Sequence, residues 1–187
     1  MPTLMFDSDN PDVLKEPIFN ENRVATYADL LTPELVAFFG PRLAVIDRGH
    51  GDPMNRAHIA DIEPGALSIE QGAEAMKKWT AEGRQYVTGY VNRSEQDQLA
   101  PLVSGIKHSL WVATLDGNMD VGDQYTAMVQ FAPESQFGLH VDVSIVYHEW
   151  WLPLGRTIST ASAESIVTQT SALLAAAGNL SRAVAVL

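Results

Sequence analysis

Three carboxylates stand at or near the ends of two short apolar segments. Asp47 closes the run in AVIDRGHG, and Asp61 and Glu63 lie two positions apart in ADIEPGA. In a strand, residues two apart point to the same face, about 6.5–7 Å from one another. Crowded acids raise the pKa of a neighbour, and a pair with one protonated and one ionised carboxyl can hydrolyse glycosidic bonds. The plainer interpretation, in which a strand-end Asp caps a turn, stays open.

The elements that would position these acids alternate between strands and helices. Apolar runs predict six strands, over residues 43–47, 58–63, 85–91, 110–115, 127–132 and 141–147. Several are continuously apolar, which is typical of strands covered on both faces. Capping signals and apolar spacing predict helices over residues 32–39 and 68–83, and a further helix from 94 that Pro101 limits or breaks. Strands joined by helices predict a parallel α/β sheet or barrel, whose chemistry gathers at the carboxyl ends of the strands.

The two ends of the chain read differently from the middle. Residues 1–30 are polar and broken by Asn-Pro and Glu-Pro, which predicts an extended N-terminal arm. Residues 153–187 predict a Ser/Thr linker and then a helix, whose apolar residues from Ile166 to Leu187 are spaced four and three apart. Such a heptad seam favours packing between chains. Packing of the helix on its own domain, over residues 31–152, would give the same spacing.

Composition excludes several classes of function. The 187 residues include 12 basic and 23 acidic side chains, for a formal charge of −11, which argues against binding to nucleic acid or to anionic membranes. The absence of cysteine excludes disulfides and Cys-based metal sites. No signal peptide and no membrane-spanning run is expected. His50, Asp52 and His58 have no metal-site spacing, and Gly49 and Gly51 do not precede a helix, so neither a metal nor a cofactor is predicted.

The order of these segments resembles the family 25 glycoside hydrolases, lysozyme-like barrel enzymes that cut the peptidoglycan backbone, and glycoside-hydrolase-like proteins encoded among the tail genes of actinobacterial phages. In the enzymes an Asp ends the first strand, matched here by Asp47, and an Asp-x-Glu follows, matched by Asp61 and Glu63. The later strands are matched by LWVATLD with Trp111, MVQFA with Gln130 and Phe131, and HVDVSIV with Asp142.

The resemblance implies roles for these residues. Glu63 would be the general acid and Asp61 its partner, which stabilises the transition state or orients the acetamido group of the sugar. Asp47 and Asp142 would position this pair and tune its pKa. The substrate-binding residues would be Tyr90, Trp111, Gln130 and Phe131, with the three aromatic rings as stacking faces.

The chain also departs from the family. Only about ten residues separate Asp47 from the Asp-x-Glu strand, where the enzymes fit two further βα units. The matched span, 42–147, is far shorter than the roughly 250 residues of a full eight-strand barrel. We therefore expect a reduced, incomplete TIM-like barrel of about six strands, whose open edges are covered by the arm, the tail helix or a second subunit.

Three functions are consistent with the sequence. The first is a virion protein of a phage tail, a minor tail protein that uses its barrel for assembly or for engaging cell-wall polysaccharide. Its partners would be other virion subunits, with a homo-oligomer formed through the C-terminal helix. The second is an active peptidoglycan-cleaving enzyme, and the third is a cytoplasmic sugar-processing enzyme.

Overall fold

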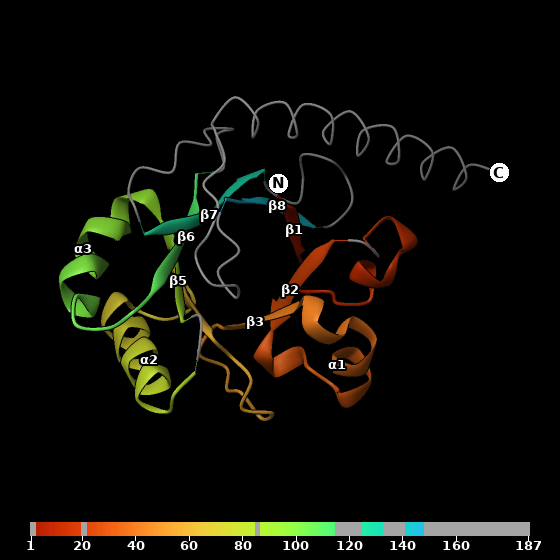
Figure 1. The fold of residues 1–187 in the computed structure, drawn as a ribbon, viewed down its shortest axis with the longest axis horizontal. Coiled ribbons are helices and arrows are strands. Elements are labelled where there is room, and N and C mark those ends of the chain that lie inside the picture. The colour runs from red at the N-terminus through yellow and green to blue at the C-terminus, as the bar shows by residue number, and fades with distance from the viewer. Residues whose placement is uncertain (1–2, 20–21, 85–86, 115–124, 133–140, 148–187) are drawn as a thin grey trace.

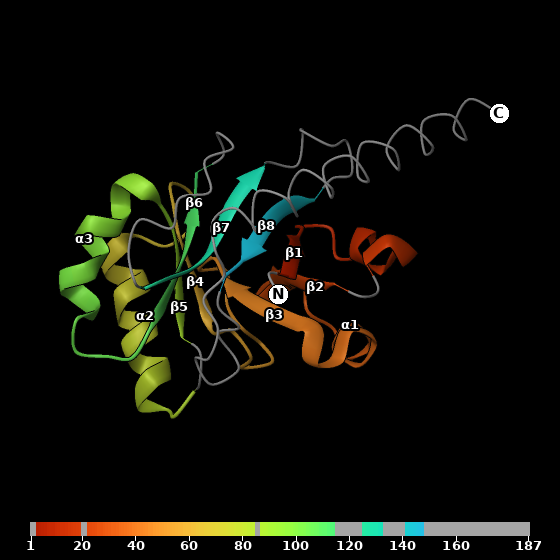
Figure 2. The ribbon, with the colours of Figure 1, turned by 45° about the horizontal axis from the view of Figure 1, so that its top comes forward.

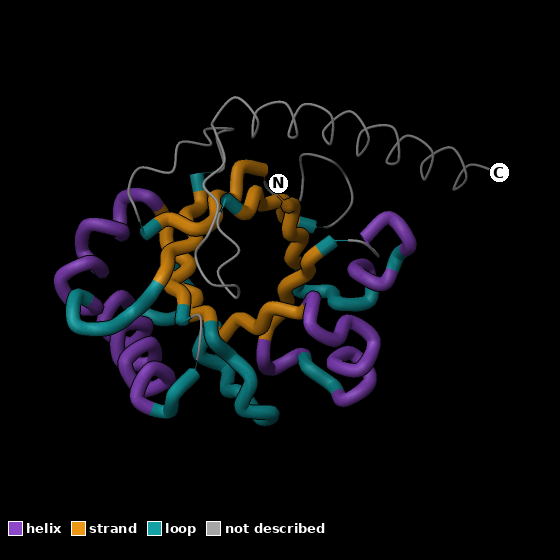
Figure 3. The backbone as a smooth tube through the Cα atoms, viewed as in Figure 1, coloured by secondary structure: helices purple, strands orange, loops and turns teal. Residues whose placement is uncertain are grey.

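The computed structural model describes residues 3–19, 22–84, 87–114, 125–132 and 141–147, and these form a closed eight-stranded barrel (Figure 1). Figure 3 shows the strands as a ring with the helices outside it. The strands, in chain order, are β1 (Thr3–Asp7), β2 (Arg23–Tyr27), β3 (Leu43–Asp47), β4 (Ile59–Ile62), β5 (Thr88–Asn92), β6 (Ser109–Ala113), β7 (Thr126–Ala132) and β8 (Asp142–Val146). The predicted α/β barrel is therefore present.

The barrel is mostly parallel, and one strand closes it in the opposite direction. Strands β1 to β7 pair in sequence order, each parallel to the next. The last strand, β8, lies between β7 and β1 and is antiparallel to both, as its arrow in Figure 2 shows. Every strand therefore has two neighbours, and the described sheet has no open edge.

Two predictions about the barrel are wrong. It has eight strands and is closed, where an incomplete barrel of about six was expected. The two additional strands come from the segment that was predicted to be an extended arm, because β1 pairs with β8 and β2 pairs with β3. Their apolar residues, among them Phe6 and Val24, are buried. The proline-containing breaks lie between the strands. Pro11 precedes a short 3-10 turn, Val13–Lys15, and Pro17 begins a second one, Pro17–Phe19.

In the described part of the chain, three α-helices cover the barrel: α1 (Pro33–Phe39), α2 (Ile69–Ala81) and α3 (Arg93–Val103). The Thr32 hydroxyl accepts a hydrogen bond from the Leu35 amide at the start of α1, and Ser68 and Gln71 form the predicted capping box of α2. Pro101 lies inside α3, which continues to Val103 rather than breaking at the proline. In Figure 1, α2 and α3 lie side by side on one flank of the barrel and α1 lies on another.

The apolar side chains form layers inside and outside the ring of strands. The inner layer contains Met5, Ala25, Ile46, Ile59, Trp111 and Met128. Outside, α2 and α3 pack on β4, β5 and β6, and α1 packs beside β1 and β2. Gly72 allows α2 to approach β4, because a Cβ at this position would lie 2.3 Å from the Ile62 side chain.

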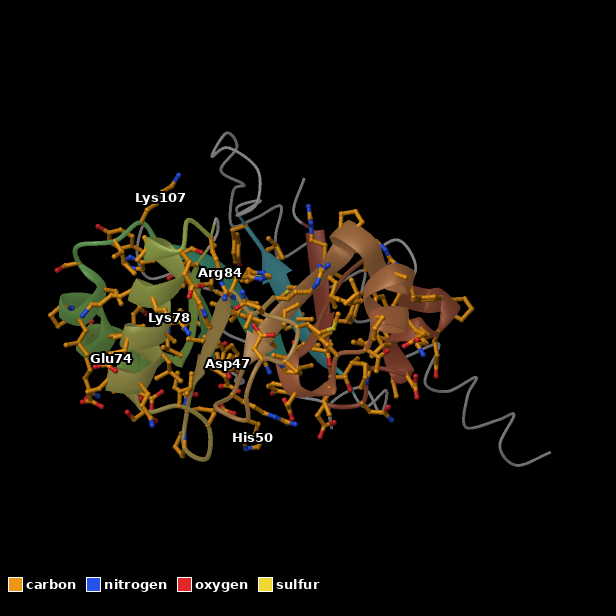
Figure 4. The ribbon with its side chains drawn as sticks, turned by 90° about the horizontal axis from the view of Figure 1, so that it is seen from below. Asp47, His50, Glu74, Lys78, Arg84 and Lys107 are labelled. Atoms are coloured by element: carbon orange, nitrogen blue, oxygen red, sulfur yellow. The ribbon has the colours of Figure 1, made fainter. Side chains whose placement is uncertain are left out.

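The connection from β3 to β4 has no helix and is held by polar contacts. Asp52 accepts a hydrogen bond of 2.7 Å from the Ala57 amide. Arg84, which is labelled in Figure 4, donates to the Ala57 carbonyl and to the Asn55 side chain and lies 3.7 Å from Asp52. These contacts fix the loop, which begins at the end of β3 beside the acids.

The predicted tail helix over 153–187 lies outside the described residues. None of the helices that the structure describes is long and apolar enough to cross a membrane.

Candidate functional site

Four acidic side chains meet at one rim of the barrel. Asp7 ends β1, Asp61 lies in β4 and Glu63 directly follows that strand. Asp142 begins β8, and because β8 runs against β1, its first residue lies at the same rim as the last residue of β1. Asp7 and Asp142 are in fact register partners. The site is therefore built by strands from both ends of the described chain.

Side-chain alternation turns these acids into the barrel. Met5 and Ile59 belong to the inner apolar layer, and Asp7 and Asp61 each follow two residues later, on the same face of their strands. Asp7 is 6% exposed and Asp61 is 2% exposed, while Glu63 is half-buried. Two carboxyls are therefore deep in the mouth of the barrel and a third lies nearer to solvent.

Burial and mutual repulsion keep protons on this cluster. Burial raises the pKa of Asp7 well above its usual range, and the charges of Asp142, Asp61 and Glu63 raise it further. Burial, followed by the charge of Glu63, raises the pKa of Asp61 to about 7. The pKa of Glu63 is raised by burial and by the charges of Asp142 and Glu95. Near neutral pH, the site therefore holds protonated and ionised carboxyls together.

Arg48, which two hydrogen bonds hold in place, lies beside these acids. Arg48, directly after β3, donates two hydrogen bonds to Asp29, of 3.1 Å from Nε and 2.7 Å from Nη2. Its guanidinium lies 4.2 Å from the centre of the Tyr27 ring, at the end of β2. The positive charge of Arg48 lowers the pKa of Asp61 and so opposes the effects of burial and of the neighbouring acids.

Aromatic rings lie below the acids. Tyr90 of β5 and Trp111 of β6 are register partners whose ring centres are 5.0 Å apart in an edge-to-face arrangement. The indole N–H of Trp111 donates a hydrogen bond of 2.9 Å to the Ser144 hydroxyl of β8, inside the barrel and past the intervening strand β7. Trp111 is fully buried, so it forms a floor, whereas Tyr90 and Tyr27 are partly exposed. Burial raises the pKa of both tyrosines, so their hydroxyls remain hydrogen-bond donors.

Three buried acceptor atoms in the barrel have no hydrogen-bond partner within the described part of the chain. They are Oδ1 of Asp7, Oδ1 of Asp61 and Oε1 of Gln130. Gln130 is 2% exposed and follows the inward-facing Met128 by two residues in β7. Buried acceptors without a donor are costly, and ligands with N–H or O–H groups relieve that cost.

The predicted site residues are only partly brought together. Asp61, Glu63, Asp142, Tyr90, Trp111 and Gln130 all lie on the inner face or at the acidic rim. Phe131 instead packs in the outer layer with Phe6 and Val143, so the predicted stacking face points away from the barrel interior. Neighbouring residues of a strand face opposite sides, which separates Phe131 from Gln130.

Asp47 lies at the same rim but has a different environment. It follows the inward-facing Ile46 by one residue, and its Oδ1 accepts a hydrogen bond of 2.8 Å from the Gly49 amide. That contact is the turn-capping alternative considered for a strand-end Asp. The charge of Asp47 nevertheless raises the pKa of Asp61, so its predicted tuning role is compatible with this position.

Sequence reasoning missed Asp7, Tyr27 and Arg48. Asp7 closes the run TLMFD, a pattern equivalent to AVID before Asp47, and that similarity could have revealed a strand. No comparable signal identifies Arg48, since only the pairing of β2 with β3 brings it to Tyr27 and Asp29. Among the residues that the structure describes, no group of three or more acidic, His or Cys side chains could hold a metal ion.

Comparisons of the chain with protein-family models, curated proteins and solved structures find no match.

Proposed function

We propose that this protein is a glycoside hydrolase of the lysozyme-like kind, which cleaves a polysaccharide at the acidic rim of its barrel. The observation that carries the proposal is the convergence of Asp7, Asp61, Glu63 and Asp142 on one inward-facing site, where burial and repulsion raise the pKa of the first three. Hydrolysis of a glycosidic bond needs a protonated and an ionised carboxyl together, and this environment supplies both near neutral pH.

Asp61 and Glu63 have distinct roles in this mechanism. Glu63 is the more exposed, so a glycosidic oxygen can reach it. Burial and the neighbouring carboxylates raise its pKa, which favours the protonated form that a general acid needs. Ionised Asp61 then stabilises the positive charge that develops on the sugar ring. Because the two carboxyls interact, the active form is the pair that shares one proton, and its dissociation steps belong to the pair.

The remaining acids tune this pair. Asp7 and Asp142 lie on the wall formed by β1 and β8. The charge of Asp142 raises the pKa of Glu63, and the charges of Asp142, Asp61 and Glu63 add to burial in raising the pKa of Asp7. Arg48 acts in the opposite direction on Asp61. One carboxyl of the pair can thus ionise while the other remains protonated.

The strand order also supports the proposal. In the family 25 enzymes, the Asp that ends the first strand is separated from the Asp-x-Glu by two further βα units. Here the first strand ends at Asp7, and β2 and β3 lie between it and Asp61. Asp7 is therefore a better counterpart of the first-strand Asp than Asp47, and the shortening that the sequence suggested disappears.

The decisive experiment compares Glu63→Gln with Glu74→Gln. Glu74 is an exposed residue on α2, a helix on the outside of the barrel, and is labelled in Figure 4. We expect the wild type and Glu74→Gln to release reducing ends from purified peptidoglycan at equal rates. Removal of a general acid lowers rates by about 10²–10⁴-fold, so Glu63→Gln should lose that much. Thermal melts of all three proteins check that folding is unchanged.

A second outcome would favour a different function. If the wild type sediments with peptidoglycan but releases no reducing ends, the barrel is a wall-binding module, as the virion hypothesis expects. The phage-tail location, the virion partners and the homo-oligomer stay predictions, because the tail helix on which they depend lies outside the described residues.

A further inference from the structure

The two walls of the barrel mouth carry different chemistry. Asp61 lies in β4 and Glu63 directly follows it, whereas Asp7, Asp142 and Gln130 belong to the three consecutive strands β1, β8 and β7. Gln130 pairs with Ser144 of β8, and Asp142 of the same strand pairs with Asp7. Asp7 and Gln130 therefore flank the inner face of β8, on the side of the barrel away from the cleaving pair.

This second wall offers hydrogen-bond acceptors and two carboxyls, which a bound cation would help to ionise. Within the described residues, Oδ1 of Asp7 and Oε1 of Gln130 are buried without a donor. Gln130 is uncharged, so its unpartnered oxygen is an observation separate from the cluster of acids. A ligand with a hydrogen-bond donor would satisfy it. Among the described residues, the charges that raise the pKa of Asp7 come from the carboxylates of Asp142, Asp61 and Glu63. A group that brings both donors and a positive charge would satisfy the wall best.

We propose that the β7–β8–β1 wall binds a protonated primary amine, and that the preferred substrate is a polysaccharide whose sugars carry a free 2-amino group. An ammonium group has three N–H donors and no acceptor, so it complements carboxylate and amide oxygens alone. This inference rests on the proposed function, since it assumes that a sugar chain enters the barrel mouth.

The wall also discriminates against other sugars. A uronic acid or a phosphorylated sugar would place negative charge beside Asp7 and Asp142, which repel it. A neutral N-acetylated sugar supplies one amide N–H and no charge. A hydrogen bond to a charged group is stronger than one between neutral groups, by enough to change affinity about tenfold. We therefore expect the free amine to bind about tenfold more tightly than the N-acetylated sugar.

Isothermal titration calorimetry of the full-length Glu63→Gln protein tests the proposal, because this variant should bind the probes without cleaving them. The probes are the trisaccharide of glucosamine, its fully N-acetylated form, and Nα-acetyllysine amide, at about pH 6, where such amines are protonated. We expect the glucosamine trisaccharide to bind about tenfold more tightly than the N-acetylated form and to weaken in salt. Equal affinities, or tighter binding of the N-acetylated form, would overturn the proposal. Equally tight binding of the lysine amide would overturn the assignment to a sugar.

A matched pair of variants locates the amine. Asp7→Asn in the Glu63→Gln background should remove the preference for the free amine, whereas Asp97→Asn, an exposed acid on α3, should keep it. A preference that survives Asp7→Asn contradicts the assigned wall. The outcomes separate the two proposals, because cleavage of N-acetylated peptidoglycan without amine selectivity rejects only this inference. Amine-selective binding without cleavage of any polymer rejects only the hydrolase.

Discussion

Asp7 and Asp142 face one another across the antiparallel pair that closes the barrel, although 134 positions separate them in the chain. Directly opposed residues of such a pair have Cα atoms about 4.5–5.5 Å apart, so two carboxyls share one small space. Like charges at this spacing oppose ionisation, and the pKa of Asp7 is raised as a result, on top of the effect of burial. The closing strand therefore contributes directly to the chemistry of the rim.

The buried Asp61 should make stability depend on pH. Its pKa is about 7 in the folded protein and 3.8 in the unfolded reference, so the folded state binds more protons between these values. Its favourable contribution is complete below about pH 4 and is lost as the pH rises through about 7. Relative to Asp61→Asn, the wild type should lose up to about 4 kcal/mol across that window. Urea denaturation from pH 4 to 8 measures this, with Asp97→Asn as the baseline, and a pH-independent difference would contradict it.

Arg48 should set the pH at which activity falls on the acidic side of the pH profile of kcat/KM, which is called the acidic limb below. Its positive charge lowers the pKa of Asp61, so Arg48→Gln should raise that pKa and move the limb to higher pH. Arg48→Lys keeps the charge but loses the two hydrogen bonds to Asp29, and should shift the limb less. The readout is the pH dependence of kcat/KM. Arg56→Gln, in the exposed loop after β3, is the control. A limb that Arg48→Gln leaves in place would rule out this electrostatic role.

The contact between Trp111 and Ser144 should stabilise the barrel across its interior. Trp111→Phe retains an aromatic ring but removes the N–H donor, and should cost about 1 kcal/mol in the free energy of unfolding. Trp111→Ala should cost about 3–5 kcal/mol, because it also leaves a cavity. Denaturant unfolding of Trp111→Phe, Ser144→Ala and the double variant gives the coupling energy. Strictly additive losses would show that the hydrogen bond contributes nothing.

The heptad spacing of the tail predicts that the full-length chain forms an oligomer. Removal of residues 160–187 should give a folded monomer, whereas the full-length chain should form an oligomer through the apolar stripe from Ile166 to Leu187. Multi-angle light scattering of both proteins measures their masses. A full-length chain that is monomeric at high concentration would contradict this assembly.

The middle of the fold could be predicted from the sequence, because its local signals agree with its tertiary structure. β3 has the predicted bounds, and the capping box at Ser68 begins α2 where it was expected. The first two strands could not be recognised in the same way. The Pro-containing segment between them suggested an irregular arm. Their strand character depends on pairing with β8 and β3, which local sequence does not record.

The candidate site shows the same division. Asp61 and Glu63 lie two positions apart, in β4 and directly after it, so their shared face follows from a period of two. Asp7, Asp142 and Gln130 come together only because β8 lies between β7 and β1. Gln130 and Phe131 were both predicted to bind substrate, but adjacent residues of a strand face opposite sides. Phe131 therefore packs in the outer layer and does not reach the site.

The position of β8 also determines the stage of folding at which the acidic rim can form. The parallel strands β1 to β7 can assemble in chain order, but the sheet keeps two open edges until β8 joins its first and last members. This contact joins the most distant parts of the described chain, and such contacts are slow to form. A nascent chain that has not yet emerged beyond residue 141 lacks the pair formed by Asp7 and Asp142. The repulsion between these acids is therefore imposed only at ring closure, when the rest of the core can offset it.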